Sequence, residues 1–161
     1  MKSPFLFGWA KPVPVQFHRL NKPLRDMVLV ALAGPVTNVL LAFVGSFILS
    51  IMINFDISES LWLRRTLINF LLINVILAVF NMIPIPPLDG GRVAVGLLPR
   101  KLSLLLAKSE RYGLIIIITA LFFLPLLGQQ IGIRLEPIHW FIRSISSFLI
   151  GIIATLTGLH I

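Results

Sequence analysis

The chain has 161 residues, of which 57% are hydrophobic and only 12% are charged. In a soluble domain about a quarter of the residues are charged, so this chain has too little polar surface to cover a soluble core. Its net charge of +8 comes from basic residues that flank apolar runs instead of forming one stripe. This pattern is typical of an integral membrane protein and argues against nucleic acid as a partner. The absence of cysteine excludes disulfides and thiolate metal sites.

Long uncharged runs locate the membrane spans, because about 20 helical residues cross the hydrocarbon layer. They predict an all-α integral membrane protein in which residues 1–161 form a single membrane domain. Membrane lipid is therefore an expected partner. The last span includes Arg143, whose long side chain can reach the interface from near one end of the helix. We expect about four transmembrane helices, with approximate bounds of 27–53, 62–86, 103–127 and 138–160.

Basic residues predict the orientation of these spans, because cytoplasmic loops carry an excess of Lys and Arg. Two segments are strongly basic: the one before the first span and the one between the second and third spans. Both are therefore predicted to be cytoplasmic, and four spans would return the chain to the same side. We expect both termini in the cytoplasm.

The segment before the first span, residues 1–26, is expected to lie at the membrane interface as a short extended or hairpin segment. Its stretch "FGWAKPVPVQF" alternates proline and valine, and residues before a proline favour extended geometry. Two interpretations remain open. The segment either anchors the first helix, or offers an open edge to which an extended peptide adds as a strand.

The first span contains "ALAGPVTN", in which Gly34 precedes a proline and Asn38 follows four residues later. Residues four apart share one face of a helix, and a small residue beside a buried amide favours close helix packing. The motif by itself therefore predicts a packing face.

The second span runs into "NMIPIPPLDGGR", where Pro84, Pro86 and Pro87 predict that the helix ends or unwinds near Ile83. We expect an extended run that delivers Asp89, followed by glycines that permit unusual backbone geometry. An aspartate at bilayer depth costs roughly 2.5–3.5 kcal/mol, so something must compensate it. Either Asp89 belongs to a functional site, for example as a zinc ligand, or it is a turn residue at the cytoplasmic interface.

The stretches "FLFGWAKPVPV", "ALAGPVTN" and "NMIPIPPLDGGR" resemble, in order and spacing, the motifs of site-2 proteases, the intramembrane zinc metalloproteases. The resemblance covers residues 3 to about 100 and is to the compact prokaryotic branch. It implies a prokaryotic cell membrane, a zinc cofactor, and hydrolysis of peptide bonds in transmembrane segments of a protein or peptide substrate. It also implies that Asp89 is the third zinc ligand. The expected neighbours of the site, or substrate-binding residues, are Gly34, Asn38, Pro86, Pro87 and Gly90.

The chain departs from the family in one respect, since it has no histidine-glutamate-x-x-histidine motif. Its histidines are His18, His139 and His160, and no two of them are four residues apart. Only one of three expected zinc ligands is therefore present, and no catalytic glutamate. We expect a truncated chain that lacks an upstream helix and is inactive alone. The alternative is a catalytically inactive relative that acts as a membrane substrate-binding or partner protein.

Overall fold

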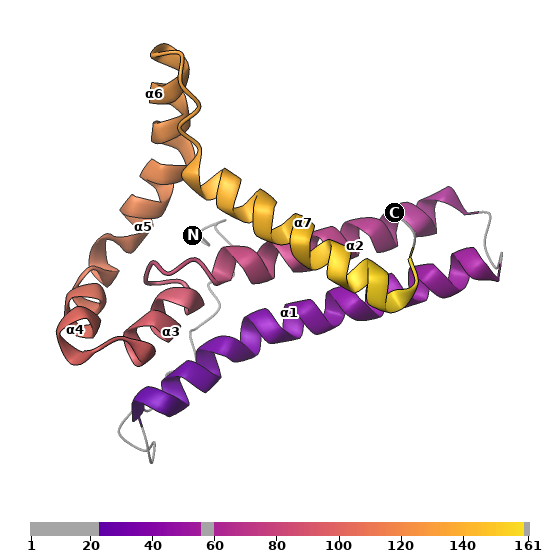
Figure 1. The fold of residues 1–161 in the computed structure, drawn as a ribbon, viewed down its shortest axis with the longest axis horizontal. Helices are drawn as coiled ribbons and strands as arrows, with labels where there is room; N and C mark the ends of the chain where they lie inside the picture. Colours follow the sequence, from indigo (N-terminus) through magenta and orange to yellow (C-terminus); the bar gives the residue numbers. More distant parts are fainter. Residues whose placement is uncertain (1–22, 56–59, 160–161) are drawn as a thin grey trace, which may run out of the picture.

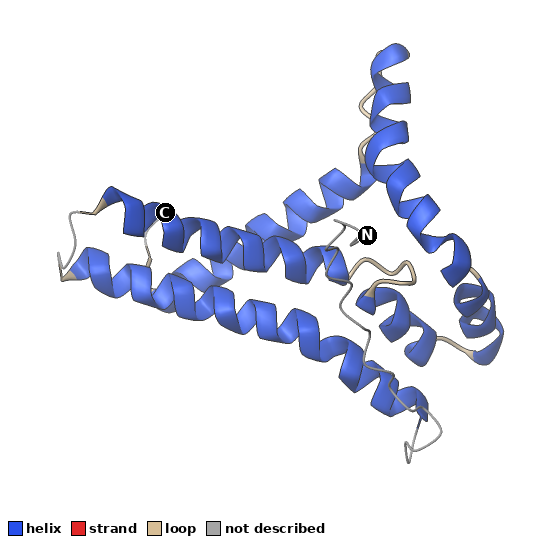
Figure 2. Cartoon of the chain, turned by 180° about the vertical axis from the view of Figure 1, so that it is seen from behind, coloured by secondary structure: helices blue, strands red, loops and turns tan. Residues whose placement is uncertain are grey.

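The computed structural model describes residues 23–55 and 60–159, in which all regular structure is helical (Figure 2). This confirms the all-α class. The predicted hairpin segment, apart from the start of the first helix, lies outside the described residues. In chain order the elements are α1 (Pro23–Asn54), α2 (Leu61–Asn81), α3 (Asp89–Leu97), α4 (Arg100–Lys108), α5 (Glu110–Ile118), the π-helix η2 (Thr119–Phe123), α6 (Leu124–Gln130) and α7 (Pro137–Thr157).

Within residues 23–55 and 60–159, four helical stretches are long and apolar enough to cross a membrane, as expected for an integral membrane protein. They are Leu24–Asn54, Leu61–Asn81, Glu110–Gln130 and Pro137–Thr157. The second ends five residues before the expected bound of 86, because the prolines stop the helix. The third begins at Glu110 instead of residue 103, because the separate basic helix α4 occupies the preceding residues.

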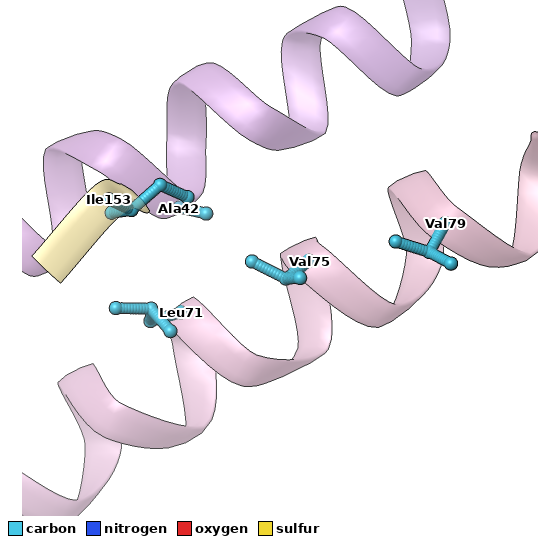
Figure 3. Packing of buried hydrophobic residues seen from close by; sticks show 5 residues of the cluster. All are labelled: Ala42, Leu71, Val75, Val79 and Ile153. Carbon is cyan, nitrogen blue, oxygen red and sulfur yellow. The ribbon is translucent and has the colours of Figure 1, made fainter. Parts of the chain in front are cut away.

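The core lies where α1, α2 and α7 pack side by side (Figures 1 and 3). In α2, Leu71, Val75 and Val79 recur every four residues and so form one buried stripe. They meet Ala42 of α1 and Ile153 of α7 (Figure 3). The small side chain of Ala42, which is fully buried, allows the three helices to approach closely.

Helix α7 runs in the same direction as α1 (Figure 1). Near the end of α7 the hydroxyls of Thr157 and Ser46 share a hydrogen bond of 2.7 Å. Twelve residues before Thr157, Ile145 of α7 lines a cavity together with Pro35, which lies eleven residues before Ser46 on α1. The predicted cytoplasmic position of both termini depends on four spans that alternate in direction. In such an arrangement α7 would be antiparallel to α1. This packing therefore does not support that arrangement, and the orientation of the termini stays a prediction.

The continuous helical arm of α5, η2 and α6 projects away from the bundle (Figure 1). Its large apolar side chains are mostly exposed, as lipid-facing residues of a membrane protein would be. The exposed set includes Leu114, Ile115, Ile118, Phe122, Phe123, Leu126 and Leu127. The arm contacts α7 through η2 and leads into the connection at residues 131–136.

The direction of α7 can be tested by cross-linking, because the chain has no native cysteine. The contact of Ser46 with Thr157 predicts that Ser46→Cys combined with Thr157→Cys forms a disulfide in membranes under mild oxidation. The matched pair, Ser46→Cys with Ser146→Cys, should stay reduced, since Ser146 lies about 16 Å further back along the helix. Cross-linking of the second pair instead of the first, read as a mobility shift on gels, would contradict this packing.

Candidate metal-ligand site

The proline segment between α2 and α3 folds as consecutive tight turns. The Met82 N–H caps α2, and the next N–H groups bond only two or three residues back: Ile85 N–H to the Ile83 carbonyl at 2.8 Å, and Leu88 N–H to the Ile85 carbonyl at 3.1 Å. The prediction that the helix ends near Ile83 is confirmed. The prediction of an extended run was wrong, because local backbone hydrogen bonds fold the segment back on itself.

Asp89 is the first residue of α3 and follows Leu88 at the N-cap. An acidic side chain in the first turn of a helix is favoured by the helix dipole. The residue is half-buried, and its carboxylate has no hydrogen bond or ion pair with the described residues. The carboxylate is therefore a hydrogen-bond acceptor at the end of an apolar bundle, and its oxygens remain available to bind a ligand.

The Asp89 carboxylate lies against α1 at Gly34. A methyl group placed on Gly34 would come within 3.3 Å of Oδ2 of Asp89, which is tighter than an ordinary contact. The structure thus brings together two residues that are 55 positions apart in the sequence and that the family resemblance placed near one centre. Any side chain at Gly34 would reduce the space around the carboxylate.

The glycines after Asp89 act through close packing and not through unusual backbone angles. Gly90 and Gly91 are buried within α3, and neither has a positive φ. A Cβ on Gly91 would come 2.7 Å from the Cα of Pro86, and one on Gly90 would come 2.7 Å from the Ile83 carbonyl oxygen. The expectation that these glycines adopt unusual backbone geometry was therefore wrong. They let α3 pack directly on the backbone of the proline turns, which fixes the position of Asp89.

A third glycine, which the sequence analysis did not single out, completes this packing. Gly113 of α5 is buried, and a Cβ there would come 2.8 Å from Cδ of Pro87 and closer still to the Pro86 carbonyl group. The only signal in the sequence was a lone glycine at the start of an apolar span, which is common at helix interfaces in membranes. The proline turns are thus held between α3 and α5.

Asn38 lies one turn beyond Gly34 on α1, about 6 Å along the helix axis. Its side chain is half-buried and makes no hydrogen bond with the described residues. An amide in this state has both donor and acceptor groups available. Asn38 is therefore a candidate for binding a polar group held near Asp89.

The described residues contain one candidate ligand for zinc, Asp89, but not a complete site. They contain no group of three His, Cys, Asp or Glu side chains that could hold a metal ion. A catalytic zinc ion ordinarily takes three protein ligands and a water. His139, in the first turn of α7, is exposed, whereas His18 and His160 lie outside the described residues. Asp89 fits the carboxylate position of such a site, and the other positions need ligands from elsewhere.

Comparisons with known proteins agree with the resemblance drawn from the motifs. Residues 50–125 match the model of peptidase family M50. A Bacillus subtilis protein named "Putative zinc metalloprotease YwhC" is 38% identical over 124 residues, covering 74% of this chain and 56% of the relative. A Methanocaldococcus jannaschii protein named "Putative zinc metalloprotease MJ0611" is 48% identical over 64 residues, 40% of this chain and 31% of the relative. No solved structure matches the chain significantly.

These matches place residues 50–125 in peptidase family M50, the family of the site-2 proteases. The matched segment contains Asp89 and the proline turns, whereas Gly34 and Asn38 precede it. The chain spans about half the length of the Bacillus subtilis relative and about a third of the other.

The packing of the proline turns predicts a difference between two glycine substitutions. Gly91→Ala forces a methyl group onto the backbone of Ile85 and Pro86 and should lower the free energy of unfolding by about 1–3 kcal/mol. Gly151→Ala, on the open side of α7, meets no atom within 4 Å and should be neutral or slightly stabilising. Unfolding by sodium dodecyl sulfate, followed by circular dichroism, measures both. Equal stability of the two variants would contradict the packing described here.

Proposed function

We propose that this chain provides the Asp89-bearing part of an intramembrane zinc endopeptidase of the site-2 type. One observation carries the proposal: the Asp89 carboxylate is half-buried against Gly34 and has no partner within the described part of the chain. An ionisable side chain in such a position within a membrane protein marks a functional site by default. The family match and the names of the relatives support a zinc metalloprotease, and the assignment of Asp89 as a ligand is part of this proposal.

In the proposed enzyme Asp89 supplies one of three protein ligands, and two histidines and a glutamate come from a further helix. Zinc, when bound, polarises the scissile carbonyl and lowers the pKa of its bound water to about 7. This chain's own contribution is the fixed position of a negatively charged oxygen donor. The contacts of Gly91 and Gly113 with the proline turns hold the donor in place without a flexible loop.

Asn38 is proposed to bind the substrate backbone or the oxyanion that develops during hydrolysis. Its amide makes no hydrogen bond in the described structure, so no existing interaction has to be broken. A donor aimed at developing charge in an apolar site stabilises the transition state, because little water screens the charge there.

The proposed substrate is a transmembrane segment of another protein or a membrane peptide. The outer faces of the helices are largely apolar and suit a lipid environment, so a substrate would reach Asp89 from within the bilayer. The scissile segment must be locally unwound, since a helix keeps its carbonyl groups hydrogen-bonded.

A second candidate function is a membrane partner or substrate-binding protein without catalysis. The observation in its favour is that the 161 residues contain no histidine-glutamate-x-x-histidine motif. The two candidates differ in whether Asp89 binds zinc when such a motif is supplied.

The proposal predicts the effect of Asp89→Asn in a chain joined to a helix that carries the histidine-glutamate-x-x-histidine motif. The amide keeps the size of the side chain but loses its charge, so bound zinc and cleavage of a membrane-embedded substrate should both fall to background. Zinc content by atomic emission and product formation on gels are measured at equal expression. Glu110→Gln, an exposed carboxylate in the first turn of α5, is the matched control and should retain both.

Two outcomes would count against the proposal. Normal zinc content and turnover in Asp89→Asn would show that Asp89 is not a metal ligand. Failure of the joined chain with intact Asp89 to retain zinc would favour the non-catalytic partner.

Asn38→Leu should separate metal binding from transition-state stabilisation. The substitution removes the amide and keeps a similar volume. We expect kcat to fall about 10²–10³-fold, as for loss of an oxyanion donor, while zinc content stays unchanged. A loss of zinc together with activity would show that Asn38 supports the metal site instead.

A further inference from the structure

A second polar site lies where the chain leaves α6 and enters α7, outside the Asp89 site. A pocket of about 460 Å³ is lined there by Arg134 and Glu136 of the connection and by Trp140 and Arg143 of the first two turns of α7. Leu124 of α6 and Pro137 add apolar surface. Nothing in the proposed protease chemistry uses these residues.

The pocket carries a net positive charge. Two guanidinium groups and one carboxylate line it, and neither arginine forms an ion pair with Glu136 or with any other carboxylate of the described chain. Both guanidiniums are exposed and neither is neutralised by an ion pair, so an anion bound at the pocket would be attracted by both. Arginine is suited to this role because its planar fork donates two parallel hydrogen bonds to a phosphate or carboxylate.

The position of the pocket in the chain indicates what the anion is. Arg143 lies within the candidate span Pro137–Thr157, six residues after its start, and Trp140 lies one turn before Arg143. Tryptophan gathers at the level of lipid headgroups, and an arginine near a span's end extends to the same level. Phosphodiester groups are the anions concentrated at this depth. The apolar part of the lining suits the acyl chains that accompany them.

We propose that this pocket binds an anionic phospholipid. Its phosphodiester lies between Arg134 and Arg143, and the part of its acyl chains nearest the headgroup lies against Leu124 and Trp140. The single negative charge of such a lipid neutralises the net charge of +1 that the two arginines and Glu136 give the pocket. A zwitterionic lipid would leave the charge in place. Bound lipid would also compensate Arg143, the charge that the last span brings towards the bilayer.

The charges of the lining predict opposite effects of neighbouring substitutions. Arg134→Gln and Arg143→Gln each remove a positive partner of the phosphodiester, and each should weaken binding of anionic lipid about fivefold. Glu136→Gln removes a negative charge from the same pocket and should strengthen that binding. If these residues had a purely structural role, the arginine and glutamate substitutions would not have opposite effects on lipid binding.

Trp140 allows the test to be made at the site itself. The chain contains three tryptophans, so Trp9→Phe and Trp62→Phe leave Trp140 as the sole emitter. Its fluorescence is titrated in neutral detergent with brominated phosphatidylglycerol or brominated phosphatidylcholine, whose bromines quench a tryptophan on contact. We expect half-maximal quenching at a clearly lower concentration of phosphatidylglycerol. The double variant Arg134→Gln, Arg143→Gln should abolish the preference, and Glu136→Gln should increase it.

The matched control is Arg64→Gln with Arg65→Gln, which removes the same charge from the exposed start of α2 and should keep the preference. Equal quenching by the two lipids, or an equal loss of preference in the control, would overturn the proposal. Inorganic phosphate at millimolar concentration should not remove the preference. If it did, the pocket would be a site for free phosphate and not for lipid. Circular dichroism of each variant checks the fold, and the reversed effect of Glu136→Gln decides the outcome if the arginine variants unfold.

Discussion

The position of Asp89 depends on backbone-to-backbone contacts that only glycine permits. Gly91 places the first turn of α3 directly on the proline turns, and Gly113 places α5 on their other side. Side chains at these positions would move the helices apart by about the width of a methyl group or more, and the carboxylate would move away from Gly34. A charged side chain within the membrane is unfavourable in free energy unless it has a defined partner. The rigid turns thus hold a costly group in one place, as a metal ligand requires.

The sequence predicted the helical class and the end of α2 because both follow from local physics. Long uncharged runs have few alternatives to membrane helices, and prolines remove hydrogen-bond donors wherever they occur. The contact between Asp89 and Gly34 was expected only from the family resemblance. Periodicity could not predict it, since it joins two helices through a turn whose path depends on tertiary packing.

Two errors had physical causes. Prolines favour extended geometry, but in this segment the hydrogen bond from Leu88 N–H to the Ile85 carbonyl closes a tight turn. Paired glycines suggest a turn, but Gly90 and Gly91 are helical because the space beside them is filled by backbone atoms. The direction of α7 was also beyond sequence reasoning. Charge bias indicates the side of the membrane on which a loop lies and not which helices pack together.

Asp89 is proposed to contribute an oxygen ligand to zinc, and X-ray absorption at the zinc edge tests this assignment directly. The sample is the zinc-loaded chain joined to a helix with the histidine-glutamate-x-x-histidine motif, compared with its Asp89→Asn variant at matched zinc content, with any shortfall in the variant made up by added metal. We predict two imidazole nitrogens at about 2.0–2.1 Å and a carboxylate oxygen at about 2.0–2.2 Å, with the carboxylate contribution absent from the variant. Identical spectra for the two proteins would show that Asp89 does not bind the metal.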